Sequence, residues 1–300
     1  MKKTYSFKAY GLCFQSDIDL PGLPRCSEVP DVFIRLETLD EAQLAAIPNR
    51  GERIFGYIYD ELLFLVEEGR SITLDIQNGV EENVVRSYLK GVLMAILLRQ
   101  RGFLVLHACC IAQEGQAIAF VGESGWGKST IAEYFCQKGY DLINDDILAL
   151  RIVEGEPVLA TPGYPEIRLR ADSGGRLRED FEMLPRINTR VNKRIRSVLK
   201  LPEGTVPVVR LFLLEKDYGA ATELETMNTR EAIVRLAAHT RVKHLFEYPE
   251  HQTLNLQQCA TLTRQIQVMR LRRVKSIAML SSIWEMITQE LAESHESQAA

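Results

Sequence analysis

The fold is decided by the stretch Gly122-Glu123-Ser124-Gly125-Trp126-Gly127-Lys128-Ser129-Thr130, which fits the pattern G-x-x-x-x-G-K-[ST] at every fixed position. An apolar run over residues 117–121 precedes this stretch and has the character of a strand. After it, apolar residues recur at helical spacing as far as Gly139, and glycine is favoured just beyond a helix end. The order of strand, glycine-rich loop and helix predicts an α/β fold with a nucleotide-binding core around this loop.

A loop of this kind binds phosphate. Its backbone N–H groups surround phosphate oxygens at the positive end of the following helix, and glycine lets the chain approach them closely. Lys128 would then reach the β- and γ-phosphates, and the Ser129 hydroxyl would bind Mg²⁺. The whole of 122–130 is therefore predicted to bind a nucleotide, with ATP and Mg²⁺ as cofactors. The alternative interpretation is a chance glycine-rich turn between a strand and a helix.

The composition is that of a globular protein with one large α/β domain or two smaller ones. Of the 300 residues, 46% are hydrophobic and 25% are charged. The net charge of -4 is too small to indicate a nucleic-acid or membrane partner, so neither is expected.

The cysteines and the N-terminus favour a cytoplasmic protein. No C-x-x-C spacing occurs among the six cysteines, which are Cys13, Cys26, Cys109, Cys110, Cys136 and Cys259. A chain of this size does not need disulfides to fold, so all six are predicted to be reduced thiols. Met1 is followed by polar and charged residues rather than an apolar leader, and the most apolar segment, 92–98, is too short to span a bilayer.

The part before the loop divides at about residue 80. From residue 5 to 74 the apolar residues alternate in short runs between turns, which predicts a small antiparallel sheet with no catalytic constellation. Residues 81–100 change to helical spacing and predict one helix with a broad apolar face. We therefore expect a β-rich N-terminal region over 1–80 and a nucleotide-binding domain over 81–300.

Three polar residues interrupt apolar strands near the loop. His107 ends the predicted strand 103–108, where it is either a hydrogen-bonded structural residue or a site residue. Asp145 and Asp146 interrupt an apolar run, and two adjacent carboxylates need a cation or the edge of a site. With Mg²⁺ nearby, one aspartate would bind the metal and its neighbour would accept a proton from an attacking hydroxyl. The alternative is an Asp-Asp turn between two strands.

Three motifs together resemble the HPr kinase/phosphorylase-type P-loop kinases. They are Leu106-His107-Ala108, the loop 122–130 and Asn144-Asp145-Asp146. The resemblance implies an HPr-kinase-like P-loop core that phosphorylates a serine hydroxyl in a protein. It implies that His107 is an active-site histidine, that Lys128 and Ser129 bind phosphate and metal, and that Asp145 and Asp146 are the paired acids, one of them the general base.

Weaker motifs resemble one branch of these kinases, the shorter proteins found with lasso-peptide maturation systems. They are Tyr10-Gly11-Leu12, the stretch Thr161-Pro162-Gly163-Tyr164-Pro165-Glu166-Ile167-Arg168-Leu169, and Arg270-Leu271-Arg272-Arg273. This resemblance implies a precursor peptide with an acceptor serine near its end as the partner. Residues 169–173 replace the glycine-rich segment of true HPr kinases, which points away from HPr and from reverse phosphorolysis. The wider resemblance to kinases of the HPr type, which assemble into rings, implies that a homo-oligomer is possible.

Further charged residues are candidates for stabilising the transferred phosphate. Glu166 and Arg168 are predicted at a strand edge. Residues 176–201 are basic and lack regular apolar positions, and their cations include Arg186, Arg190, Lys193, Arg194, Arg196 and Lys200. They form either a mobile loop that meets phosphate oxygens or a solvated surface, with Lys193 and Arg194 the first pair to test.

The rest of the chain supplies structure. We expect a buried strand over 207–215, helices over 230–236, 242–245 and 253–268, a strand over 268–271, a helix over 276–291 and a frayed tail from 293. His239, His244 and His251 lack the spacing of a helical zinc pair, so no metal is assigned to them.

The motifs together with this resemblance imply an ATP-dependent kinase with a serine acceptor on a peptide or small protein. Lys128 would hold the phosphates, Ser129 and Asp145 the Mg²⁺, and Asp146 the acceptor hydroxyl, although the two aspartates can exchange these roles. Two alternatives stay open: a kinase for free serine or another small hydroxyl metabolite, and a non-catalytic ATP-binding scaffold for peptide maturation. The acceptor, the donor nucleotide and the oligomeric state are left open.

Overall fold

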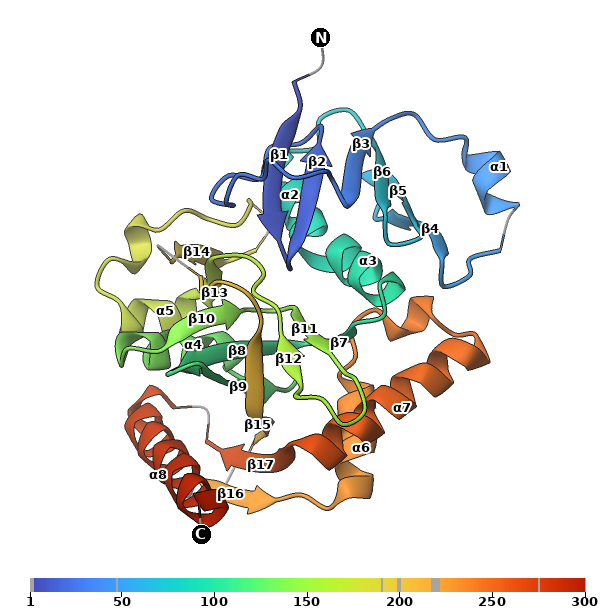
Figure 1. The fold of residues 1–300 in the computed structure, drawn as a ribbon. Coiled ribbons are helices and arrows are strands. Elements are labelled where there is room, and N and C mark those ends of the chain that lie inside the picture. Colours follow the sequence, from blue (N-terminus) through green and yellow to red (C-terminus); the bar gives the residue numbers. More distant parts are fainter. Residues whose placement is uncertain are drawn as a thin grey trace.

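Two large β-sheets and one two-stranded sheet organise the chain in the computed structural model (Figure 1). The structure describes residues 3–46, 48–189, 191–198, 201–216, 222–274 and 276–299. The N-terminal sheet lies at the top of Figure 1, the larger sheet lies below it, and the C-terminal helices lie against the larger sheet. The mixed α/β class expected from the sequence is confirmed.

The N-terminal sheet has six strands in the order β1-β2-β3-β6-β5-β4. The strands are β1 Tyr5–Ala9, β2 Leu12–Ser16, β3 Val32–Leu36, β4 Arg53–Ile58, β5 Leu62–Glu67 and β6 Ser71–Ile76, with the short helix α1 Glu41–Ala45 between β3 and β4. The expectation of an antiparallel sheet is wrong for β3, which runs parallel to both β2 and β6. The long connection 17–31 returns the chain to the end of the sheet at which β2 began. Strand β3 therefore runs in the same direction as β2, whereas a hairpin would have made the two strands antiparallel.

A disulfide closes this connection. Cys13 of β2 is bonded to Cys26, with the two Cα atoms 5.8 Å apart. The prediction that all six cysteines are reduced is therefore wrong for this pair, because the returning connection carries Cys26 back to β2. The other four, Cys109, Cys110, Cys136 and Cys259, are free thiols.

Reducing the Cys13–Cys26 disulfide is expected to lower the free energy of unfolding by about 3 kcal/mol, because the bond closes a short loop in the unfolded chain. Urea denaturation with and without reductant measures the effect. Cys136→Ser, at a free thiol, should keep the response to reductant, whereas Cys13→Ser should abolish it. An unfolding midpoint that reductant leaves unchanged in the wild-type protein would contradict the expectation.

The predicted helix over 81–100 is confirmed with an interruption. It consists of α2 Glu82–Tyr88, a π-helical turn over Leu89–Leu93, and α3 Met94–Gln100, with non-helical backbone at Gly91. These helices lie between the two large sheets (Figure 1). Their apolar side chains share one core with β1 to β6, with Val105 and Ala149 of the larger sheet, and with Ile147 just before β11. The division of the chain at residue 80 stays a prediction.

The larger sheet has nine strands, seven of them in the order β10-β8-β9-β15-β12-β11-β7, while β17 pairs with β15 and β16. The strands are β7 Leu104–Leu106, β8 Ala108–Gln113, β9 Gln116–Val121, β10 Asp141–Asn144, β11 Leu148–Arg151, β12 Leu159–Ala160, β15 Val206–Lys216, β16 Glu223–Thr226 and β17 Gln267–Arg273. Because β9, β15 and β17 are mutually parallel, their carboxyl ends share one edge of the sheet. Ligands of open α/β sheets bind outside such an edge.

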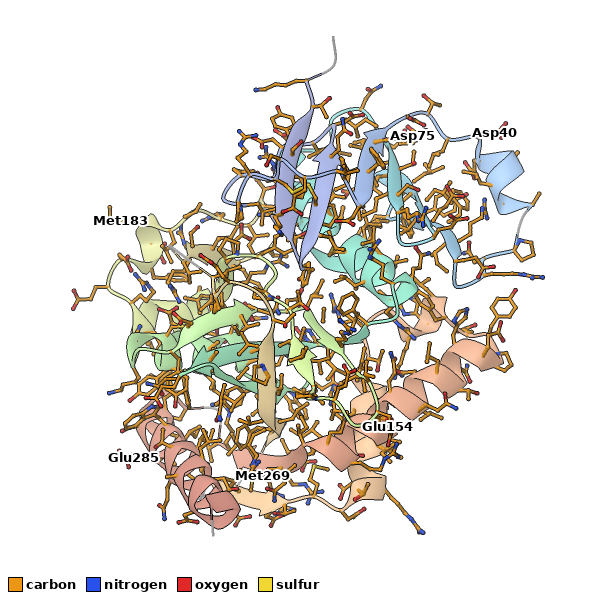
Figure 2. The ribbon with its side chains drawn as sticks, in the orientation of Figure 1. Asp40, Asp75, Glu154, Met183, Met269 and Glu285 are labelled. Carbon is orange, nitrogen blue, oxygen red and sulfur yellow. A yellow bond between two sulfur atoms is a disulfide. The ribbon has the colours of Figure 1, made fainter. Side chains whose placement is uncertain are left out.

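Helices cover both faces of the larger sheet. On one face lie α4 Lys128–Gln137, α5 Ala171–Leu177 and α8 Leu280–Ala299, packed on a core that includes Met269, labelled in Figure 2. On the other face lie α6 Thr229–Ala238 and α7 Pro249–Gln265. Helix α8 continues past residue 293, where the sequence led us to expect a frayed tail. Among the described residues, none of the helices combines the length and the apolarity that a membrane crossing needs.

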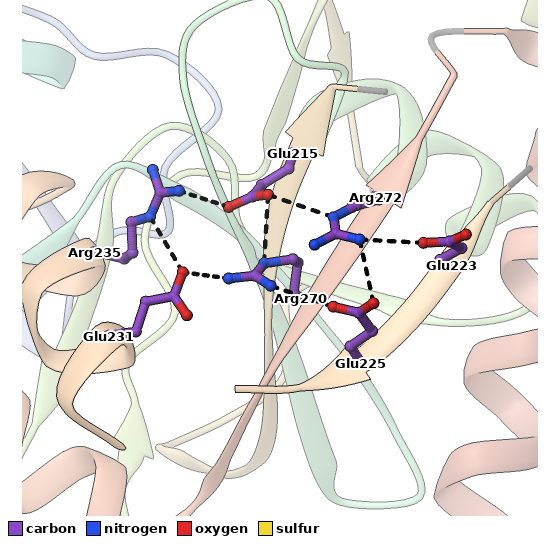
Figure 3. A network of polar contacts seen from close by, with 7 residues as sticks. All are labelled: Glu215, Glu223, Glu225, Glu231, Arg235, Arg270 and Arg272. Atoms are coloured by element: carbon purple, nitrogen blue, oxygen red, sulfur yellow. Dashed lines mark hydrogen bonds and ion pairs between the residues drawn. The ribbon is translucent and has the colours of Figure 1, made fainter. Parts of the chain in front are cut away.

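A network of ion pairs fixes the carboxyl end of β17 (Figure 3). Arg270 contacts Glu215 of β15 and Glu225 of β16, and it also pairs with Glu231 of α6. Arg272 pairs with Glu223 and Glu225 of β16 at 3.2 Å each. Partly exposed pairs of this kind stabilise little one by one, but this network ties β17 to two strands and a helix.

Candidate functional site

The loop 122–130 connects β9 to α4, as its sequence predicts. Gly125 and Gly127 have φ of 81° and 87°, a conformation that favours glycine, and Gly127 caps the helix. Lys128, Ser129 and Thr130 form the first turn of α4. The first N–H groups of a helix have no partner within it and present partial positive charge, so this end of α4 is suited to an anion.

Lys128 turns back over the loop. Its Nζ donates to the carbonyl oxygens of Gly122 at 2.8 Å and Glu123 at 2.9 Å, and the residue is only 5% exposed. Burial lowers the pKa of Lys128, an effect that nearby carboxylates oppose. A cation held this way by neutral carbonyls would gain strongly from a phosphate at the loop.

Arg273, at the end of β17, contacts the loop. Its Nη2 donates to the Trp126 carbonyl at 2.6 Å. A Cβ at Gly127 would lie 2.0 Å from that Nη2, so the arginine fits against the loop only where residue 127 has no side chain. The sequence analysis did not assign Arg273 to the site.

Gly127→Ala is expected to weaken ATP binding at least about tenfold and to destabilise the fold by about 1–2 kcal/mol, because the alanine is strained at positive φ and displaces Arg273. Calorimetric titration and thermal unfolding measure the two effects. The matched control is Gly139→Ala at the far end of α4, where φ is also positive but nothing lies within 4 Å of the new Cβ. The control should lose stability and keep its ATP affinity; equal affinities in the two variants would contradict the expectation.

Asp145 is hydrogen-bonded to the start of α4. The Ser129 hydroxyl donates to Asp145 Oδ1 at 2.9 Å, and the backbone N–H of Arg168 donates to Oδ2 at 2.8 Å. Burial raises the pKa of Asp145, and the Arg168 N–H opposes the rise. A cation beside this carboxyl would favour its ionised form.

The pair Ser129–Asp145 fits Mg²⁺. A hydroxyl and a carboxylate are hard oxygen donors, and Mg²⁺ is commonly held by one or two carboxylates together with phosphate oxygens. Among the described residues, no group of three or more His, Cys, Asp or Glu side chains is placed to hold a metal ion.

Asp146 is surrounded by cationic and hydrogen-bonding groups. Its Oδ1 lies 3.0 Å from His107 Nδ1, and its Oδ2 lies 3.4 Å from Arg168 Nη1 and 3.6 Å from Arg241 Nη2. Burial alone would raise the pKa of Asp146, but His107 and the two guanidinium groups outweigh it and hold the pKa well below the usual range. The two neighbouring aspartates therefore differ: Asp146 is firmly ionised, and Asp145 is the one that gains from a cation.

Strand pairing brings His107 to Asp146. Strands β7 and β11 are antiparallel with Leu106 opposite Leu148, so the residues that follow and precede them lie together. Asp146 itself has φ of 77°, which is unusual for a residue other than glycine and occurs frequently at functional sites.

Arg241 is a site residue that the sequence analysis missed. An isolated bridge between Leu106 and Thr240, together with a hydrogen bond from Arg241 N to Val105 O at 2.9 Å, brings it to the acids. Its Nε is buried and has no hydrogen-bond partner among the described residues. A lone arginine after a helix carries no sequence signal for this position.

The described part of the basic stretch contains regular structure. Strands β13 Glu166–Arg170 and β14 Lys193–Ser197 form an antiparallel pair, so Lys193 and Arg194 are not in a mobile loop. Successive strand residues face opposite ways, and of these two only Lys193 lines the cavity of the site. Arg194 instead donates to the Leu184 carbonyl at 2.7 Å and pairs with Glu182.

The remaining candidates divide in the same way. Arg168 lines the cavity together with both aspartates, whereas Glu166 is buried against Lys90 of the π-helical turn. Arg196 pairs with Glu133 of α4 and does not line the cavity. Arg190 and Lys200 lie outside the described residues.

One cavity unites most of the predicted site. Its lining includes His107, Ser124, Gly125, Gly127, Lys128, Ser129, Thr130, Asp145, Asp146, Arg168 and Lys193. A loop suited to an anion, an oxygen pair suited to a metal and an ionised carboxylate thus face one space.

Comparisons with known proteins give similarity to solved structures but no match by sequence. No protein-family model matches the chain. None of the curated proteins matches it. The structure of the Hpr(Ser) kinase/phosphatase from Coxiella burnetii resembles it with a TM-score of 0.34 and 12% sequence identity, covering 64% of this chain and 98% of that one. The residues of the site, rather than this similarity, support the function proposed below.

Proposed function

We propose that the protein is an ATP-dependent kinase that transfers the γ-phosphoryl group to a serine hydroxyl of a peptide or small protein. The observation that carries the proposal is the single cavity in which Lys128, Ser129, Asp145 and Asp146 meet. Phosphoryl transfer depends chiefly on positioning and on charge stabilisation, and this cavity offers groups for both.

On the donor side, the start of α4 and Lys128 would bind the phosphates. Ser129 and Asp145 would hold Mg²⁺, the group that neutralises charge on the phosphate oxygens when it is bound. Lys193 and Arg168 line the same cavity and would stabilise charge on the transferred group.

On the acceptor side, Asp146 would orient the serine hydroxyl. The serine oxygen forms the new bond to the γ-phosphorus as the bond to the bridging oxygen breaks, ADP leaves, and the hydroxyl proton passes to Asp146. Because its pKa is held low, Asp146 is a weak base that accepts the proton late, which suits a loose transition state.

A peptide acceptor is favoured over a small metabolite by a second, larger cavity. It has a volume of about 620 Å³ and is lined by Tyr10, Gly11, Pro162, Gly163 and further residues of the 161–165 and 201–205 segments. Tyr10 Oη donates to the carbonyl of Ile147, the residue after Asp146, at 3.4 Å. This supports an extended acceptor such as a lasso-type precursor peptide, in keeping with the resemblance of the motifs at Tyr10 and Thr161–Leu169 to the kinases of that branch.

The test is transfer of label from [γ-³²P]ATP to a peptide that ends in serine, compared with the same peptide ending in alanine and with free serine. Labelling of the serine peptide alone is expected. Labelling of free serine alone would indicate a metabolite kinase, and tight ATP binding without any transfer would indicate a scaffold. Either result would overturn the proposal.

A further inference from the structure

A third cavity adjoins the phosphate site beside the first turn of α4. Thr130, Asp172 and Ser173 line both, so the two spaces are neighbours along the helix. The adjoining cavity has a volume of about 190 Å³, and Arg176, Arg273, Ser276 and Ile277 complete its lining. None of the roles assigned above uses this space.

Arg273 is a buried cation without an anionic partner among the described residues. It is 3% exposed, and the one side-chain hydrogen bond of its guanidinium to the described residues is that from Nη2 to Trp126 O. Burial lowers the pKa of its guanidinium to about 10, so the group stays charged at neutral pH. A guanidinium has five N–H donors, and a single carbonyl leaves most of them available to a ligand.

The topology places this cation where a ligand of the sheet is expected. Val121 of β9 lies level with Leu213 of β15, and Leu213 lies level with Arg270 of β17. The loop and Arg273 therefore extend from the same carboxyl edge, at which α/β sheets bind nucleotides. The ion pairs of Arg270 and Arg272 in Figure 3 fix the strand end that carries Arg273.

We infer that the nucleoside end of the phosphoryl donor occupies this adjoining cavity and that Arg273 binds the α-phosphate. The inference rests on the proposed function only in taking the donor to be a nucleotide. Thr130 stands between the two cavities, next in the chain to the residues that hold the outer phosphates. Asp172, which also pairs with Arg170 at 3.8 Å, and Ser173 offer acceptors for ribose hydroxyls, and Ile277 offers apolar surface to a base.

Calorimetric titration of MgATP and magnesium pyrophosphate into Arg273→Gln and Arg273→Lys tests the arginine. Pyrophosphate needs only the loop and Lys128. Arg273→Gln should therefore weaken MgATP binding at least about tenfold and pyrophosphate binding less than about twofold. Arg273→Lys should have an intermediate effect on MgATP binding. If Arg273 only supports the loop, both ligands will weaken by the same factor, and the inference is wrong.

Ser276→Trp tests the cavity without touching the arginine. The indole should fill the space, weakening MgATP while leaving inorganic triphosphate unaffected, whereas Lys128→Met should weaken both. Wild-type protein that binds triphosphate as tightly as MgATP would overturn the inference and leave the kinase proposal intact. If the variants behave as expected but the wild-type protein phosphorylates no acceptor, the kinase proposal is overturned and the inference about the cavity stands. If the wild-type protein binds neither MgATP nor triphosphate, both are refuted.

Discussion

Replacing Lys128 by methionine is expected to lower the rate of phosphoryl transfer by about 10²–10⁴-fold, because the substitution removes the cation that the loop carbonyls hold ready for the phosphates. Methionine fills a similar space, so the loop keeps its shape. Initial rates with the labelled donor measure the effect.

The matched control is Lys138→Met, at the exposed end of the same helix. It should transfer phosphate at the wild-type rate. A Lys128→Met protein that retains most of its activity would contradict the assignment of the loop as the donor site.

The same substitution should leave the protein as stable as the wild type or more stable at pH 7. Burial lowers the pKa of Lys128 from its ordinary 10.5, so the native state holds the lysine proton less tightly than the unfolded state. At a pH below the lowered pKa, protonated Lys128 therefore reduces the free energy of unfolding. This reduction disappears as the pH rises through the lowered pKa toward 10.5. Loss of activity without loss of stability would mark the lysine as a functional residue.

Asp146→Asn is expected to lower the turnover number by about 10²–10⁴-fold with little change in ATP affinity. Asparagine tolerates the positive φ of this position, so the backbone is preserved while the charge that faces His107, Arg168 and Arg241 is lost. Turnover from transfer assays and ATP affinity from calorimetry separate the acceptor side from the donor side.

The control is Asp141→Asn, the same substitution at the exposed start of β10. It should change neither quantity. An Asp146→Asn protein whose ATP affinity falls as far as its turnover would place this aspartate on the metal and exchange its role with that of Asp145.

The parts of the site that could be predicted from the sequence are those built from neighbours in the chain. The loop needs only consecutive residues, so its pattern predicts both the strand before it and the helix after it. His107 and the aspartates could be assigned because each ends or interrupts an apolar run, and such positions reach the edge of a sheet.

The parts that could not be predicted depend on distant pairing. Arg241 reaches the acids only through the bridge between Leu106 and Thr240. Lys193 and Arg194 face opposite sides only because β14 pairs with β13. The disulfide required knowing that the connection 17–31 returns along β2. In each case a contact between segments that are distant in the sequence decides which side a residue faces. The local spacing of residues does not predict such a contact.

The turn that joins β1 to β2 connects the N-terminal sheet to the candidate site. Tyr10 in this turn donates to the carbonyl of Ile147, and Ile147 packs in the same core as Phe14 and Ile34. The N-terminal sheet, which carries none of the candidate site residues, thus contacts the residue that follows Asp146. A change in the N-terminal sheet that moves Tyr10 would therefore shift the backbone next to Asp146 while leaving the glycine-rich loop before α4 unchanged.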